Sequence, residues 1–195
     1  GDVAREFEFD RVFGPDASQG DVFTSCTLPL VEAVLAGTNA CMFAFGQTGA
    51  GKTHSMIGPE GGRRQDSQAG VLPRASAELF RRLAQLESDA ARVIGGTGFS
   101  AYEVRASFIE VYCESAFDLL GAKLSGAREA SAACQLREQQ VPCPRVYAEG
   151  ATEARVTSTA KLLELVARGA ANRVTAATGV HAHSSRSHAM LVLSV

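Results

Sequence analysis

Apolar residues follow a helical spacing in three segments of the chain. They recur every three or four positions from Val22 to Leu35, in the stretch that Pro73 opens, and from Thr157 to Arg173. Ser18 is suited to cap the first of these helices because its hydroxyl can accept from the free N–H groups of the first turn. Gly37 is suited to end the same helix, since glycine tolerates the left-handed backbone of a helix terminus.

Four other segments have the pattern of strands. The alternation of apolar and polar residues from Phe7 to Phe13 and from Glu103 to Cys113 predicts strands that enter the core. The continuous apolar runs at Asn39 to Phe45 and in LVLSV, the last five residues, predict buried strands, the first of them central to a parallel sheet. Because strands and helices alternate, we expect an α/β three-layer sandwich whose central sheet is mixed and mostly parallel, with helices on both faces.

Composition narrows the classes of protein and partner. A chain of 195 residues with 46% hydrophobic residues is long enough for one domain with its own core. The net charge of -2 provides no general basic field, so no nucleic-acid partner is expected. No apolar run reaches the length of about 18 residues that a membrane span needs. The five cysteines lack C-x-x-C spacing, which argues against a zinc site and favours a reducing, intracellular compartment.

The strongest chemical signal is GQTGAGKT, which matches G-x-x-x-x-G-K-S/T at every fixed position. It lies between a predicted strand and a predicted helix, where backbone N–H groups and a helix N-terminus face bound phosphates. The lysine places an ammonium among the β and γ oxygens of a nucleotide, and the threonine supplies a hydroxyl for Mg²⁺. The predicted phosphate-binding residues are Gly46, Gln47, Thr48, Gly49, Ala50, Gly51, Lys52 and Thr53.

A second polar cluster, HAHSSRSH, spans His181 to His188. Two interpretations are open for its consecutive residues Ser184, Ser185, Arg186 and Ser187. They form either a solvated loop or a group that completes a Mg²⁺ shell, positions a water or contacts the γ-phosphate.

Several segments, in order along the chain, resemble the kinesin motor domain. They are Phe7–Phe13, Gly37–Asn39, Phe45–Thr53, Gly70–Ala75, Phe108–Glu114 with Asp118–Leu120, Leu136–Glu138, Ala167–Arg173 and Ser184–His188. We interpret residues 1–195 as one partial kinesin motor domain, truncated at both ends and ending just after switch I. The resemblance implies a P-loop NTPase fold, the cofactors ATP and Mg²⁺, microtubules (tubulin) as the partner, and a location on the cytoskeleton in the cytoplasm.

The resemblance also implies roles for particular residues. Ser184 and Ser185 would belong to switch I, which closes on the γ-phosphate and on the water shell of the magnesium. Arg186 would pair with a switch II glutamate, so these three residues are the expected catalytic group. Thr53 and Ser185 are the expected metal ligands. His54 is either a contact near the adenine or an exposed histidine at the start of a helix.

One departure from the family leaves the function open between two hypotheses. Kinesin switch I has an asparagine where this chain has His181, which replaces an amide of fixed charge with a titratable imidazole. The first hypothesis is a fragment of an ATP-dependent microtubule motor. The alternative is a kinesin-like microtubule-binding or scaffold module that holds nucleotide without hydrolysing it.

Two segments of the family are absent from this sequence. They are the R-x-R-P strand and the D-L-A-G-S-E segment of switch II, so we expect the 195 residues by themselves to be inactive as an ATPase. The longer protein is expected to be oligomeric through regions outside this sequence. The part of the track-binding surface expected here is the lobe from about Leu136 to Thr157, with Arg137, Arg145 and Arg155 as candidate contacts. For any single arginine we favour an ordinary solvated hairpin, because isolated surface charges contribute little.

Overall fold

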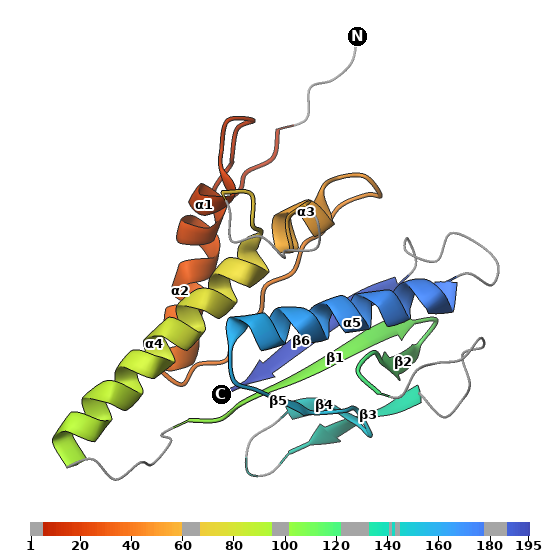
Figure 1. The fold of residues 1–195 in the computed structure, drawn as a ribbon. Coiled ribbons are helices and arrows are strands. Elements are labelled where there is room, and N and C mark those ends of the chain that lie inside the picture. The colour runs from red at the N-terminus through yellow and green to blue at the C-terminus, as the bar shows by residue number, and fades with distance from the viewer. Residues whose placement is uncertain are drawn as a thin grey trace.

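A computed structural model describes residues 6–59, 67–94, 102–121, 133–140, 142, 145–177 and 187–195. The elements in chain order are α1 (Gln19–Val22), the π-helix η1 (Phe23–Thr27), α2 (Leu28–Leu35), α3 (Lys52–Met56), α4 (Val71–Ile94), β1 (Val104–Tyr112), β2 (Ser115–Asp118), β3 (Ala133–Gln139), β4 (Arg145–Glu149), β5 (Ala154–Val156), α5 (Thr159–Ala177) and β6 (Ser187–Ser194) (Figure 1).

The caps predicted for the first helix are confirmed. Ser18 forms a capping box with Asp21, in which each side chain accepts from the backbone N–H of the other. Hydrogen bonds from the side chain and backbone of Ser18 lower the pKa of Asp21. At the other end, Gly37 has a φ of 86°, its N–H donates to Val34 O, and the N–H of Thr38 donates to Ala33 O. These two bonds are those of a Schellman motif, so Gly37 ends the helix as predicted.

A π-helical turn interrupts this helix, and the sequence pattern did not predict it. The N–H of Leu28 donates to Phe23 O, one residue further back than in an α-helix. Pro29 follows directly, and it has no N–H to give to the carbonyl four residues before it. The missing donor makes the shift in hydrogen bonding inexpensive at this position.

The sheet is built on β1, and its pairings are antiparallel, so the predicted mostly parallel sheet is wrong for the residues described. β6 runs beside almost the whole of β1, while β5 pairs with the start of β1 and β2 with its end. β3 joins β2 to β4 to complete the sheet. Cys113 and Glu114, which connect β1 to β2, have φ values of 47° and 59°. Two consecutive residues with positive φ make a tight hairpin turn, which forces the two strands to be antiparallel.

The hydrophobic core lies between the helices and one face of the sheet. On that face Phe108 is paired with Leu191 and Ala106 with Leu193. α5 lies along this face, α4 packs against α5, and α2 packs against α4 (Figure 1). The helices contribute Val31, Leu79, Leu83, Leu162, Leu165 and Val166 to the same core.

The opposite face of β6 is open. Met190 and Val192 are 43% and 48% exposed there. The predictions of helices on both faces and of a fully buried last strand are therefore wrong for the described residues.

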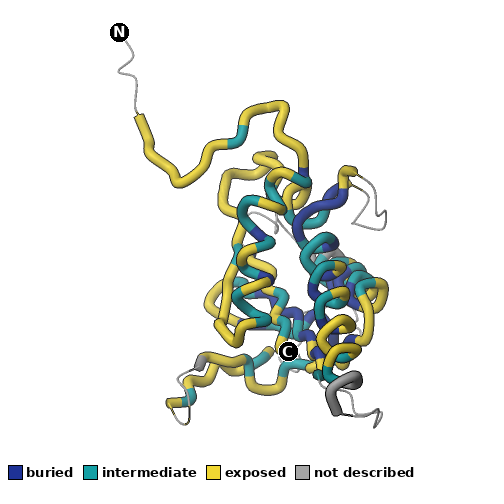
Figure 2. Tube along the Cα trace, turned by 90° about the vertical axis from the view of Figure 1, so that its left-hand side faces the viewer, coloured by how far each residue is buried: buried dark blue, intermediate teal, exposed yellow. Residues whose placement is uncertain are grey.

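Two predicted strands are absent. Residues 6–13 and 39–45 have no strand assignment, and Phe7 and Phe45 are 72% and 95% exposed. Figure 2 shows the N-terminal stretch as an exposed segment that leaves the body of the molecule. A strand forms only where a neighbouring strand satisfies its backbone groups, and within the described residues no strand pairs with either segment.

α5 approaches the sheet closely at Gly169. A Cβ at this position would lie 2.3 Å from Cδ1 of Phe108, which is itself buried. Glycine costs about 1 kcal/mol of helix propensity relative to alanine, so it is retained here for space.

We therefore expect Gly169→Ala to destabilise the fold by about 1–3 kcal/mol, because overpacking outweighs the gain in propensity. Urea denaturation of the substituted protein measures the change. The double variant Gly169→Ala with Phe108→Leu should lose less stability than the sum of the single changes, since the smaller side chain leaves room for the methyl group. Additive losses would show that the two residues do not press on each other.

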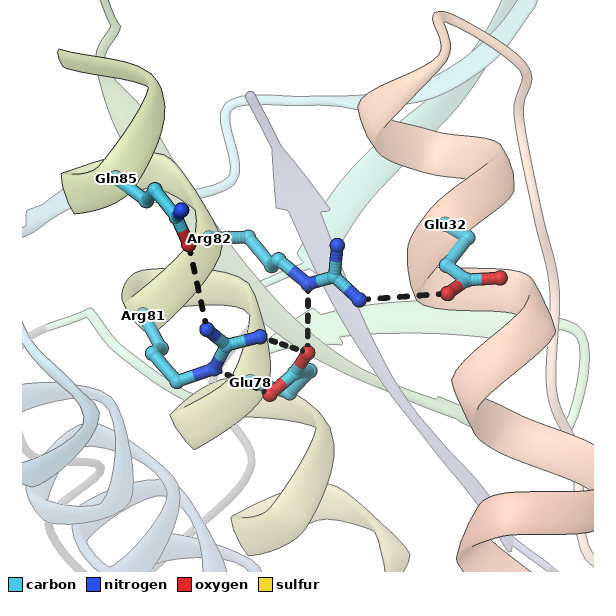
Figure 3. Close-up of polar contacts among 5 residues, drawn as sticks. All are labelled: Glu32, Glu78, Arg81, Arg82 and Gln85. Carbon is cyan, nitrogen blue, oxygen red and sulfur yellow. Dashed lines mark hydrogen bonds and ion pairs between the residues drawn. The ribbon is translucent and has the colours of Figure 1, made fainter. Parts of the chain in front are cut away.

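Charged side chains join α4 to α2 on the surface. Glu78 accepts from Arg81 and Arg82, and Arg82 also contacts Glu32 on α2 at 3.4 Å (Figure 3). The hydrogen bonds from Arg81 and then Arg82 lower the pKa of Glu78 to about 2, so this carboxylate stays charged in mild acid. Such exposed pairs contribute about 0.2–1 kcal/mol each. Among the helices described, none combines the length and apolar content that crossing a bilayer requires.

Candidate nucleotide-binding site

The predicted phosphate loop is a tight turn that leads directly into α3. The N–H of Ala50 donates to Gln47 O at 3.2 Å, which closes the turn. Gly49 and Gly51 have φ values of 85° and 83°, a backbone conformation that side chains with a Cβ rarely adopt. Gly51 is also the residue immediately before α3, so the helix predicted to follow the motif is confirmed.

Lys52 is folded over this loop. Its Nζ donates to Gly46 O and to Gln47 O, each at 2.7 Å. Two of the three ammonium hydrogens are used in this way, which leaves one for an anionic oxygen. Among the described residues, no carboxylate forms an ion pair with Lys52. The ammonium is thus held across the turn by neutral carbonyl groups, and within the described residues no acidic side chain compensates its charge.

The free hydrogen of the Lys52 ammonium and the hydroxyl of Thr53 fit a Mg²⁺-bound polyphosphate. Thr53, the next residue of α3, is exposed. Within the part of the chain that the structure describes, no three His, Cys, Asp or Glu side chains gather as a metal site would require. Hydroxyl, phosphate and water oxygens are the ligand set that Mg²⁺ prefers over an all-protein cage, and the Thr53 hydroxyl fits that set.

His54 is connected to α1. The amide nitrogen of Gln19 lies 2.8 Å from His54 O and 3.1 Å from the ring nitrogen Nδ1. Gln19 is buried, whereas His54 is exposed. The sequence did not predict this contact, because the two residues are 35 positions apart and no single motif contains both of them.

The segment between α3 and α4 is closed at its base. The N–H of Gly70 donates to Ile57 O at 3.1 Å, and Arg74 donates to the carbonyls of Ala69 and Ser67. A Cβ on Gly70 would lie 2.6 Å from Ile57 N, so the two ends of the segment are in direct contact. The glycine-rich composition of residues 58–70 favours a surface loop, but at its described ends Gly58, Ala69 and Gly70 are buried, and residues 60–66 lie outside the description.

An ion pair to a buried carboxylate ties α5 to β1 and to the start of β6. Arg173 Nε lies 3.0 Å from Oε1 of Glu110, which is only 1% exposed. The guanidinium also donates to Ser187 O at 3.1 Å and to Ser187 Oγ at 2.8 Å. Glu110 follows Ala106 and Phe108 on the core face of β1. A charged residue in a core-facing position of an alternating strand is a signal that could have predicted a buried cationic partner.

The expected switch I residues cannot be placed beside the loop. His181, Ser184, Ser185 and Arg186 all lie outside the described residues. The description resumes at Ser187, the buried first residue of β6. The roles expected for these four residues therefore remain predictions, and the structure supports only the anchoring of the residue that follows them.

The lobe expected near Leu136 to Thr157 is an exposed antiparallel hairpin of β3 and β4, followed by β5. Arg137 donates to Glu149 at 2.9 Å, and Arg155 lies 3.7 Å from Glu103. The candidate arginines with described side chains are thus paired with neighbouring acids, in the manner of an ordinary solvated hairpin.

Comparison with protein families decides the identity of the domain. The sequence model of the kinesin motor domain family matches residues 2–195. The chain belongs to the kinesin motor domain family. This confirms the resemblance drawn from the sequence, including its coverage of almost the whole chain.

Kinesins from distant organisms are similar to this motor domain sequence. It is 35% identical to the kinesin-like protein K39 of Leishmania chagasi and 37% identical to the kinesin-like protein KIN-14O of Arabidopsis thaliana, over 98% and 100% of its own length. It is 34% identical to Klp61F of Drosophila melanogaster over 99% of its length. The chain spans only 15–20% of the length of these relatives.

A solved kinesin structure has the same fold. It is described as a fast kinesin, with implications for the ATPase mechanism and interactions with microtubules. The TM-score is 0.78 at 32% identity, and the match covers 96% of this chain and 47% of that one. The P-loop NTPase fold expected from the sequence is therefore supported by this likeness, although the strands described here pair in an antiparallel manner.

Proposed function

We propose that this chain is the nucleotide-binding part of an ATP-dependent microtubule motor. The observation that carries the proposal is the geometry of Gly46–Thr53, where Lys52 lies over the turn with no acidic partner among the described residues. Membership of the kinesin family supports ATP with Mg²⁺ as the ligand and microtubules on the cytoskeleton as the partner. The proposed phosphate contacts are those predicted from the sequence, Gly46 to Thr53, with His54 beside them.

The proposed chemistry depends on positioning and electrostatics. The Lys52 ammonium neutralises negative charge on the terminal phosphates, and the backbone of the loop holds their oxygens. Mg²⁺, held through Thr53 and Ser185, would supply further charge neutralisation on the β and γ oxygens. Ser184 and Ser185 would position the attacking water, and Arg186 would report on the nucleotide state through an ion pair with switch II.

A second candidate function rests on one substitution. His181 stands where the kinesin family has the switch I asparagine, so a module that holds nucleotide and microtubules without turnover is the alternative. The two functions share the nucleotide site and differ in the rate of hydrolysis.

Steady-state ATPase measurements on the full-length protein, with and without microtubules, separate these functions. A motor should show ATP turnover that rises severalfold or more with added microtubules. A hydrolysis-deficient module should bind fluorescent ADP and pellet with microtubules while its turnover stays at background. Loss of both nucleotide binding and microtubule binding would contradict both functions. We expect the 195 residues alone to show little stimulated turnover, because the D-L-A-G-S-E segment is not in their sequence.

A further inference from the structure

The contact between Gln19 and His54 defines which atoms of the histidine carry hydrogen. A backbone carbonyl oxygen can only accept, so the Gln19 group 2.8 Å from His54 O must be its NH₂ and not its oxygen. The same nitrogen lies 3.1 Å from His54 Nδ1. Because the amide nitrogen can only donate, Nδ1 must be the acceptor, and the proton of the neutral ring must sit on Nε2.

The amide is well placed to enforce this arrangement. Gln19 is 8% exposed and lies in α1, whose start is fixed by the capping box of Ser18 and Asp21. An NH₂ group has two hydrogens, and the two short contacts direct both of them to one residue. The ring of His54 is exposed and follows Lys52 by two positions in α3. The buried side chain of Gln19 therefore sets the orientation of the exposed His54 ring.

We propose that Gln19 is a positioning residue of the nucleotide site, whose amide holds His54 in the Nε2–H tautomer so that the ring offers a hydrogen-bond donor to a nucleotide bound at the phosphate loop. The group that receives this hydrogen bond is an acceptor atom of the ribose or the base. The inference rests on the proposed function. It adds Gln19 to the nucleotide site as a residue that acts on the nucleotide only through His54.

A double-mutant cycle in the full-length protein tests the coupling, with fluorescent ADP in the presence of Mg²⁺ as the probe. Gln19→Glu replaces the donor with an acceptor that repels His54 O and favours a proton on Nδ1. We expect this change to weaken ADP affinity about tenfold, the cost of one lost hydrogen bond. In a His54→Ala background the same change should have less than about a twofold effect, because the group through which it acts is gone.

Two further substitutions test the donor itself. Gln19→Met removes the donor without adding a charge, and it serves if Gln19→Glu fails to fold. We expect it to weaken ADP affinity about threefold or more in the His54 background and not in the His54→Ala background. His54→Gln can present an N–H near the position of Nε2, so it should bind ADP within about threefold of the unsubstituted protein, while His54→Met should not.

Gln85→Glu is the matched control, since it makes the same chemical change on the exposed part of α4 beside Arg81. It should leave ADP affinity unchanged. Equal losses from Gln19→Glu in both backgrounds, or no loss in either, would overturn the inference and leave the proposed function standing. Absence of ADP binding by the unsubstituted protein would overturn both.

Discussion

Replacement of Lys52 by alanine should weaken Mg-ATP binding to the full-length protein by about tenfold to a hundredfold. Hydrogen bonds that involve a charged group are worth about 1.5–3 kcal/mol, and the ammonium is the cation that we propose contacts the terminal phosphates. Its two contacts in the structure are with neutral carbonyls of its own loop, so among the described residues no acidic side chain competes with a phosphate for the charge. Titration with a fluorescent ATP analogue measures the loss.

Lys161→Ala is the matched control for this experiment. Lys161 is an exposed lysine of α5 that pairs with Glu164, and its removal should not change ATP affinity. Both variants should unfold at nearly the same urea concentration as the unsubstituted protein, because exposed pairs contribute little to stability. Unchanged ATP affinity in Lys52→Ala would show that the nucleotide is held elsewhere.

Replacement of Arg173 by alanine should destabilise the fold by about 3–5 kcal/mol, because it removes an ion-pair partner of a buried carboxylate. Glu110 is 1% exposed, and Arg173 Nε lies 3.0 Å from it. The change also removes two hydrogen bonds to Ser187, which anchor the start of β6 next to the predicted switch I. Urea denaturation followed by circular dichroism gives the free energy of unfolding.

Two comparisons give this result its meaning. Arg168→Ala removes an arginine from the same helix that, in the described part of the chain, donates only to Leu120 O at 3.3 Å, so we expect a loss of at most about 1 kcal/mol. The double variant Arg173→Met with Glu110→Met should recover much of the stability, because an apolar pair avoids the cost of burying charge. If Arg173→Ala and Arg168→Ala cost the same, the buried pair has no special role in the fold.

The local elements could largely be predicted from the sequence because short-range forces determine them. Ser18 and Gly37 end a helix through hydrogen bonds within four or five residues of themselves. The helices α4 and α5 and the strand β1 follow the periodicity of their apolar residues, and they are present where the pattern predicts them. The phosphate loop belongs to the same class, since its glycines are required by backbone angles within one turn.

The errors concern properties that depend on partners distant in sequence. Asn39–Phe45 and Phe7–Phe13 have the composition of strands, yet within the described residues no neighbour supplies the hydrogen bonds. The apolar content of a segment does not reveal whether another strand lies beside it. Whether two strands pair in a parallel or antiparallel manner depends on the connection between them. Two residues with positive φ, Cys113 and Glu114, were enough to make β1 and β2 antiparallel.

The sequence by itself determined the family, the glycine-rich turn that leads into α3 and the presence of the longer helices, because each of these is encoded in residues that are close together along the chain. Only the tertiary structure decided which residues support the site from a distance. Gln19 reaches His54 across 35 positions, and Arg173 joins Glu110 to Ser187 across three elements. Polar groups that are buried must find partners wherever the fold brings them, and no local pattern specifies which partner that will be.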